Sequence, residues 1–257
     1  MTNPSEDRIA LVTGSSAGIG AALARELLSR RWAVLGLSRR PGDIQHPAYR
    51  HLEVDLKDPP ALVRAMETDV RPRLSKARWR RVGLVNNAAT PAALGPLPNL
   101  DPATLQEVYA VNVIAPIWLM GFVTRAVRSG VALRVANVSS GAGVRAFPGL
   151  SAYGSSKAAL RMAGMVLAAE WESGAPGQRV PDDAAIMSYE PGVVETAMQQ
   201  NARSLSPEQM PWVGIFLDFA ARGIAVAPEA PARELAQFLE SDGRPRFAER
   251  RLGDSGA

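Results

Sequence analysis

Short apolar runs alternate with longer amphipathic segments along most of the chain. The apolar runs, rich in β-branched residues, predict buried strands at 9–12, 32–37, 51–54, 82–85, 133–138, 184–189 and 247–248. The amphipathic segments predict helices at 21–30, 58–74, 101–128, 151–171 and 228–240. This alternation is typical of a doubly wound α/β sheet with helices on both faces. We therefore expect a single Rossmann-type domain over residues 1–257, built on a mainly parallel seven-stranded sheet.

Composition narrows the chemistry of this domain. The chain has no cysteine, which excludes disulfides and thiolate chemistry, and its two histidines lie close together, so we expect no metal site. The net charge is +4, but the arginines are scattered and form no basic stripe between aromatic residues, so we expect no nucleic-acid partner. The polar N-terminus does not resemble a signal peptide, and no apolar run has bilayer length. These features predict a cytoplasmic protein without a membrane partner.

A glycine-rich turn follows the first predicted strand and opens the first helix. Such a turn lets the backbone approach a pyrophosphate, whose charge is stabilised at the helix N-terminus. A generic strand-to-helix turn is the alternative, since glycine spacing alone does not decide between the two. The candidate residues of this turn are Gly14, Ser16, Gly18, Ile19 and Gly20.

The second predicted strand ends in Ser38-Arg39-Arg40. Proteins that select NAD commonly place an acidic residue here to bind the ribose 2′-hydroxyl, and this chain has none. A guanidinium can instead pair bidentately with a 2′-phosphate. The segment therefore favours NADP(H) over NAD, with solvated loop charges as the alternative.

The segment 139–157 carries the candidate catalytic groups. Tyr153 and Lys157 are four residues apart, so a helix that begins near residue 151 presents them on one face. An ammonium near the phenol is expected to lower the pKa of Tyr153 and fit it for proton transfer. Ser140 follows the fifth strand, so its hydroxyl is expected beside the phenol. The alternative is an ordinary solvated helix face.

Two asparagine segments are further candidates. Asn86-Asn87-Ala88 closes the fourth strand, where small residues let the chain pass close to a cofactor. Asn112 lies in an apolar helical segment and needs a polar partner if it is buried. Pro116 removes the hydrogen bond to the Asn112 carbonyl, so we expect an irregular helix there. A surface asparagine beside a proline kink is the alternative.

Methionine and aromatic residues gather in the segment 197–223. Methionine is unbranched and adaptable, so this segment is a candidate cover for an apolar pocket, which we delimit as 197–226. Ordinary core packing is the alternative.

These motifs, taken in order, resemble those of the classical short-chain dehydrogenases/reductases over essentially the whole chain. The resemblance implies that Tyr153 is the general acid, that Lys157 binds the nicotinamide ribose and that Ser140 polarises a carbonyl. It also implies that Asn112 holds a water in a proton relay. The implied cofactor residues are Gly14 to Gly20, Arg39, Asp55 and Leu56 at the adenine, Asn87 and Ala88, Tyr153 and Lys157, and Pro191, Gly192, Val194 and Thr196 at the nicotinamide.

Within this family, the tract 189–200 looks like that of the sepiapterin reductase and bacterial benzil reductase branch. That resemblance implies an NADPH-dependent carbonyl reductase that acts on a small-molecule ketone or vicinal diketone, as a homodimer or homotetramer. The acidic C-terminal residue that anchors a pterin has no clear match, which favours a general ketone. The alternatives are a 3-oxoacyl thioester ketoreductase and a non-catalytic dinucleotide sensor on the same fold.

Overall fold

Seven parallel strands form one sheet in the order β3-β2-β1-β4-β5-β6-β7. The computed structural model describes residues 7–174 and 180–254. The sequence predicts a polar loop at 174–183 and a tail at 253–257, of which residues 175–179 and 255–257 lie outside the described residues. The doubly wound parallel fold predicted from the sequence is confirmed. The strands are β1 (Arg8–Thr13), β2 (Ala33–Ser38), β3 (Tyr49–Glu53), β4 (Arg81–Asn86), β5 (Ala132–Val138), β6 (Ala184–Glu190) and β7 (Phe247–Arg251).

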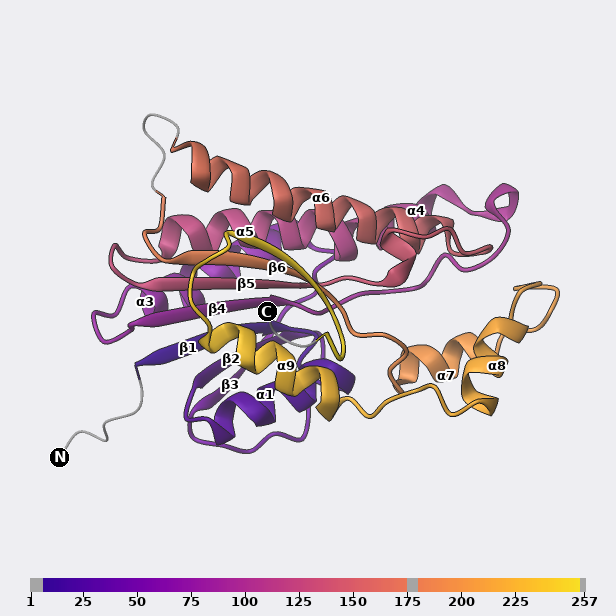
Figure 1. Ribbon diagram of the computed structural model, residues 1–257, viewed down its shortest axis with the longest axis horizontal. Helices are drawn as coiled ribbons and strands as arrows, with labels where there is room; N and C mark the ends of the chain where they lie inside the picture. The colour runs from indigo at the N-terminus through magenta and orange to yellow at the C-terminus, as the bar shows by residue number, and fades with distance from the viewer. Residues whose placement is uncertain (1–6, 175–179, 255–257) are drawn as a thin grey trace.

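Helices cover both faces of this sheet (Figure 1). Side chains alternate along each strand, so Ile9 and Leu11 pack into the core on one face while Ala10 and Val12 pack into the core on the other. Strands buried on both faces read as continuous apolar runs, which is why they were visible in the sequence. The first face is covered by α2 (Pro59–Ala65), α3 (Arg71–Leu74), α5 (Ala115–Ala126) and α6 (Ser151–Ser173), and the second by α1 (Gly18–Ser29) and α9 (Glu229–Glu240).

Two predicted helices are interrupted. The helix expected at 58–74 is α2 and α3 joined by a π-turn at Met66–Val70, and the helix expected at 101–128 is α4 (Pro102–Tyr109) and α5 joined by a π-turn at Ala110–Ile114. Each π-turn ends two residues before a proline, Pro72 or Pro116. Proline lacks an N–H and its ring crowds the carbonyl four residues earlier, so the preceding turn widens.

Within the described residues, the stretch Pro102–Ala126 is the one helix long and apolar enough to cross a membrane, and 44% of its most apolar part is buried. Core helices of globular proteins can have the same length and hydropathy. Here the stretch comprises α4, the π-turn and α5, and the buried side of α5 packs against the sheet.

The segment predicted at 197–223 forms two short helices, α7 (Ala197–Arg203) and α8 (Gly214–Ala221). They extend beyond the carboxyl ends of the strands, away from the main layers (Figure 1). Ala202, Met210, Val213 and Phe216 are buried together in a small cluster of their own. The segment is therefore a separate apolar unit at the edge of the sheet that carries the candidate site.

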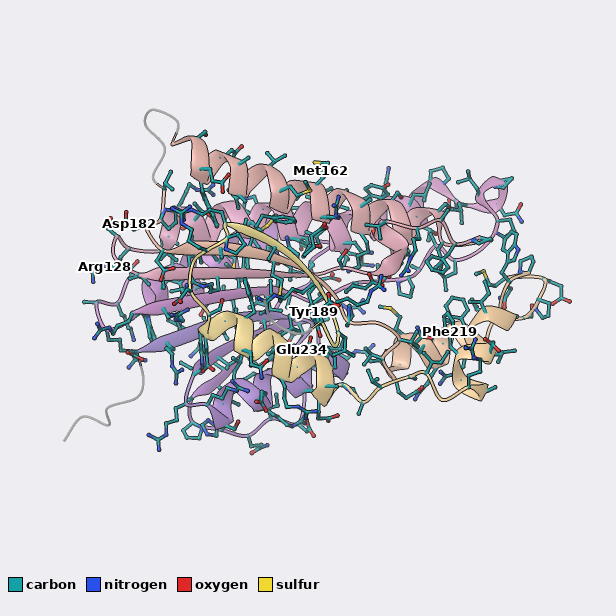
Figure 2. All side chains as sticks on the ribbon, viewed as in Figure 1. Arg128, Met162, Asp182, Tyr189, Phe219 and Glu234 are labelled. Atoms are coloured by element: carbon teal, nitrogen blue, oxygen red, sulfur yellow. The ribbon has the colours of Figure 1, made fainter. Side chains whose placement is uncertain are left out.

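Tyr189 links the carboxyl end of β6 to α9 by a side-chain hydrogen bond. Its side chain is fully buried at the end of β6, and its hydroxyl donates a hydrogen bond to Glu234 Oε2 at 2.9 Å (Figure 2). The other carboxylate oxygen of Glu234 accepts from the Gly253 N–H at 3.0 Å. The hydrogen bond between Tyr189 and Glu234 holds the end of β6 in place, and residues 191–196 leave the sheet from there.

Candidate active site

A cavity of about 850 Å³ lies at the carboxyl ends of the central strands. The strand order reverses between β1 and β4, and ligands of open α/β sheets bind at such a switch point. Its wall includes the glycine-rich turn, the ends of β2, β4, β5 and β6, the start of α6, and residues of α7 and α8. Of the predicted site residues, Gly20 and Asn112 lie outside the lining and all others belong to it.

The glycine-rich turn needs glycine for two separate reasons. Gly14 and Gly18 have φ values of +68° and +54°, which strain any residue with a Cβ. At Gly20 a Cβ would overlap the Gly14 carbonyl oxygen and lie 2.6 Å from Asn87 Nδ2. The first two positions therefore shape the turn, and the third lets α1 begin close to β1 and β4.

Thr13 braces this turn against the end of β4, and it was missed in the sequence analysis. Its buried hydroxyl oxygen accepts hydrogen bonds from the Asn87 and Ala88 N–H groups, both at 3.0 Å. Asn87 Nδ2 donates to the Thr13 carbonyl at 2.9 Å. The signal in the sequence was a threonine between the apolar strand and the first glycine.

Ser140, Tyr153 and Lys157 meet at the wall of the cavity, as their spacing predicts. Ser140 ends the segment after β5, and the other two lie on the first turns of α6. The Ser140 side chain lies close enough to the Tyr153 phenol for a hydrogen bond that lowers the pKa of the phenol, and its Oγ accepts from the Ala142 N–H at 3.2 Å. Lys157 is 1% exposed, its Nζ donates to the Val138 carbonyl at 2.7 Å, and it lies 5.6 Å from the centre of the Tyr153 ring. The solvated-face alternative is wrong for Lys157.

The expected lowering of the Tyr153 pKa is wrong for the protein chain alone. Burial disfavours the phenolate and raises the pKa of Tyr153 to about 12, an effect that the hydrogen bond with Ser140 offsets in part. Burial also lowers the pKa of Lys157 to about 8, because its ammonium is removed from water. The ammonium is committed to the Val138 carbonyl, so desolvation dominates both groups.

Asn112 lies behind the wall and is fully buried, so the surface alternative is wrong. Its Oδ1 accepts from the Thr90 N–H at 2.9 Å, and its Nδ2 donates to the Thr90 carbonyl at 3.0 Å and to Ser156 Oγ at 3.1 Å. Ser156 Oγ in turn donates to the Tyr153 carbonyl at 2.7 Å. Asn112 thus ties the loop after β4 to the turn of α6 that carries Tyr153.

Arg39 and Asp55 line one end of the cavity. Arg39 and the neighbouring Arg40 are exposed, so both guanidinium groups are accessible to an anion. Asp55 Oδ1 accepts from the Lys57 N–H at 2.9 Å, and the buried Leu56 follows it. The Lys57 ammonium lies 3.2 Å from Glu107 of α4, so an ion pair joins this end to the helix opposite.

The residues after β6 line the other side. Gly192 has a φ of +70°, and Val194 bridges to Val226, which fixes the path of this segment. A Cβ at Gly18 would lie 3.2 Å from Thr196 Cγ2, so the segment also lies close to the glycine-rich turn. The predicted residues Pro191, Gly192, Val194 and Thr196 all line the cavity.

Comparison with known proteins assigns a family to this arrangement. Residues 8–206 match the family model described as short chain dehydrogenase. The chain belongs to the short-chain dehydrogenase family. It is therefore an oxidoreductase with a small-molecule substrate.

Relatives of this short-chain dehydrogenase include the benzil reductase ((S)-benzoin forming) of Bacillus cereus, 29% identical over 93% of this chain and 96% of the relative. The sepiapterin reductase of Meriones unguiculatus is 34% identical over 78% of this chain and 80% of the relative. Among solved structures, the KRED1-Pglu enzyme has a TM-score of 0.76 and 26% identity, over 94% of this chain and all of that one. The resemblance to this branch is confirmed.

Short-chain dehydrogenases bind a nicotinamide dinucleotide, and the residues present fit one. The glycine-rich turn exposes backbone where a Cβ would be strained, beside the N-terminus of α1, as a pyrophosphate requires. The accessible guanidinium groups lie at the end of β2. The cavity joins this turn to the Tyr153 phenol without interruption.

Proposed function

We propose that this short-chain dehydrogenase is an NADPH-dependent carbonyl reductase that acts on a ketone or vicinal diketone, with Tyr153 as the general acid. The observation that carries the proposal is the pairing of the Ser140 hydroxyl with the Tyr153 phenol on the cavity wall, with Lys157 buried behind them. Two hydroxyl donors beside each other suit an oxygen on which negative charge develops. A non-catalytic sensor has no use for this arrangement.

The reduced dinucleotide, when bound, supplies the hydride. The Ser140 and Tyr153 hydroxyls donate hydrogen bonds to the substrate oxygen, which orients the carbonyl and stabilises the developing alkoxide. A phenol with a pKa of about 12 is fully protonated at neutral pH, so Tyr153 holds the proton that the more basic alkoxide takes. The raised pKa therefore suits a proton donor, although it opposes use of the same residue as a base.

Apolar side chains line the substrate half of the cavity, as an aryl ketone or diketone requires. Phe147 and Leu150 come from the loop before α6, and Met210 and Phe216 come from the segment 197–226. Phe219, from the same segment, also lines the cavity (Figure 2). Benzil, the substrate named for the Bacillus cereus relative, is an apolar vicinal diketone. We propose that 197–226 covers the substrate and that residues 1–257 act as one domain.

The first test concerns Tyr153. Purified protein is mixed with NADPH and benzil, and the loss of NADPH absorbance is followed. Tyr153→Phe is expected to lower kcat by a factor on the order of 10²–10⁴, because the proton donor is lost, while the Kd for NADPH changes little. Tyr109→Phe is the matched control, since that hydroxyl binds Ser155 on the outer helices and does not line the cavity. Undiminished turnover in Tyr153→Phe would refute the mechanism.

The proposed preference for NADPH depends on Arg39. A charge-assisted bond to the 2′-phosphate contributes about 1.5–3 kcal/mol, so Arg39→Ala should raise the KM for NADPH roughly 10- to 100-fold. The KM for NADH, which lacks this phosphate, should change little. Arg64→Ala removes an exposed arginine of α2 that does not line the cavity, and serves as the control. Equal effects of Arg39→Ala on both nucleotides would remove Arg39 from phosphate recognition.

We further propose a homodimer or homotetramer formed through the outer faces of α5 and α6. Large apolar side chains are exposed there: Ile117 of α5 is 42% exposed, and Met162 of α6 is 52% exposed (Figure 2). Val166, one turn after Met162 on α6, is also exposed. A patch of this kind is typical of a protein interface. Sedimentation analysis of the purified protein tests this assignment. A cytoplasmic location is proposed with it, because the reaction consumes NADPH.

A further inference from the structure

An ion pair at the cavity wall lies against Gly141, the residue that follows Ser140. Arg145 Nη2 is 2.9 Å from Glu190 Oε1, and both residues line the cavity. A Cβ at Gly141 would overlap the Arg145 guanidinium and lie 2.6 Å from Glu190 Oε1. Glycine at 141 thus lets this charged pair lie against the residue that follows the carbonyl-polarising serine.

The two partners of this pair are held very differently. The Glu190 side chain is 18% exposed and has a second partner, since Arg251 Nη2 lies 3.1 Å from Glu190 Oε2. The Arg145 side chain is 54% exposed, and Glu190 is its one ion-pair partner among residues 7–174 and 180–254. Two guanidinium groups around one carboxylate leave a positive charge in surplus. Glu190 keeps Arg251 when Arg145 turns away, so the movable charge of the cluster is positive.

The loop that carries Arg145 does not depend on the ion pair for its shape. The Gly143 N–H donates to the Ser140 carbonyl at 2.8 Å, and the Arg145 N–H donates to the Gly141 carbonyl at 2.9 Å. These backbone bonds close a short 3₁₀ turn by themselves. A half-exposed ion pair adds little to such a turn. The Arg145 side chain is therefore available for another task.

We propose that Arg145 is a specificity-determining residue that binds an anionic group next to the reacting carbonyl, so the preferred substrates include 2-oxo acids with a bulky apolar substituent. This inference rests on the proposed carbonyl reductase function. The apolar half of the cavity receives the substituent, and the guanidinium receives the carboxylate bidentately. Arg145 also offsets the repulsion between that carboxylate and the alkoxide that forms beside it.

The test compares two substrates with the same body and different charge. Phenylglyoxylate carries a carboxylate next to its ketone, and its methyl ester is neutral. With NADPH in excess, Arg145→Gln is expected to raise the KM for phenylglyoxylate at least about tenfold and to change the KM for the ester less than about threefold, because only the acid pairs with the guanidinium. Arg145→Lys keeps the charge and should restore much of the preference for the acid.

Arg161→Gln is the matched control. It removes one arginine from an ion pair that joins α6 to Glu249 of β7, and neither residue lines the cavity. The ratio of the two KM values should remain that of the parent protein. A similar rise in the KM for phenylglyoxylate in this control would attribute the effect to net charge and overturn the proposal.

The other outcomes separate this inference from the function on which it rests. Equal effects of Arg145→Gln on acid and ester, or reduction of benzil and the ester but not the acid, would overturn the role of Arg145 and leave the reductase intact. No turnover on all three substrates would contradict the reductase. Calorimetric binding of phenylglyoxylate to the NADPH-loaded protein, with and without Arg145→Gln, would then decide the role of Arg145 by itself.

Discussion

The two π-turns in the described part of the chain have the same cause and different surroundings. Each ends two residues before a proline, and in each the backbone N–H of the residue before that proline donates to a carbonyl five positions earlier, Arg71 to Met66 and Ala115 to Ala110. The helices that follow lie together on one face of the sheet, where the Arg71 guanidinium sits 4.8 Å from the centre of the Phe122 ring. The local backbone chemistry is thus duplicated within one layer.

The residues at the centres of the two turns show where the resemblance ends. Thr68 is exposed, and its hydroxyl bonds back to the Arg64 carbonyl at 2.9 Å in its own helix. Asn112 is fully buried and makes three hydrogen bonds to Thr90 and Ser156, outside its own helix. The irregular backbone follows from proline in both cases. Only the second turn lies behind the catalytic wall, so an irregular helix is by itself no sign of a functional site.

Substitutions of the central residues, Asn112 and Thr68, should show the largest difference between the two π-turns in stability and in activity. Asn112→Leu removes the partners of two part-buried backbone groups of Thr90 and leaves Ser156 Oγ without its amide donor. At about 1–3 kcal/mol for each unsatisfied group, the free energy of unfolding should fall by roughly 2–5 kcal/mol. Because the turn carrying Tyr153 loses its brace, kcat with benzil should fall on the order of 100-fold. Denaturant unfolding and initial rates measure the two effects.

Thr68→Ala is the matched substitution in the other turn. Its hydroxyl is exposed and bonds within the helix, so stability should change by less than about 0.5 kcal/mol and kcat should not change. If Thr68→Ala lowered kcat as much as Asn112→Leu does, the claim that only the second π-turn supports the active site would be wrong.

Replacing Pro116 should also lower activity, by less than Asn112→Leu does. Pro116→Ala restores an N–H that can donate to the Asn112 carbonyl and tighten the π-turn to an ordinary helix. Asn112 would then turn away from Thr90, and we expect kcat/KM to fall roughly tenfold, as for other misplacements of up to about one ångström. The restored helical hydrogen bond offsets part of the lost contacts, so the free energy of unfolding should fall by less than in Asn112→Leu. Unchanged kinetics would show that the hydrogen bonds of Asn112, and not the proline, maintain the π-turn.

Pro72→Ala makes the same backbone change in the exposed turn. No cavity residue depends on that turn, so kcat/KM should remain within about twofold of the parent value, and removal of an exposed proline from a helix should not lower stability. Thermal unfolding and initial rates of the two proline variants, measured side by side, test the comparison.

The strands were the easiest part of the fold to predict. A strand buried on both faces is a continuous apolar run, and the runs at 82–85 and 133–138 lie within one or two residues of the observed β4 and β5. The first helix begins earlier than predicted, at Gly18, because the last residues of the glycine-rich loop already have helical backbone geometry. The edge strands β3 and β7 differ more, since partial exposure weakens their apolar pattern.

The candidate site was predictable where spacing along one element decides it. Tyr153 and Lys157 share a helix face because they are four residues apart, and Ser140 follows a strand that ends beside that helix. Thr13 and Arg145 were missed, since their importance arises from contacts with Ala88 and Glu190 that are distant in the sequence. No local pattern records such pairs.

The sequence by itself determined the alternation of strands and helices, the glycines whose backbone no other residue adopts without strain, and the order of the polar groups along the chain. Each of these follows from sterics or from apolar periodicity within a few residues. Tertiary structure alone decided that the Tyr153 phenol would be buried, which raises its pKa where the ammonium was expected to lower it, and that Lys157 would be desolvated against the Val138 carbonyl. It also decided which of two equivalent π-turns lies behind the active site, because burial and electrostatics depend on what the rest of the chain places around a group.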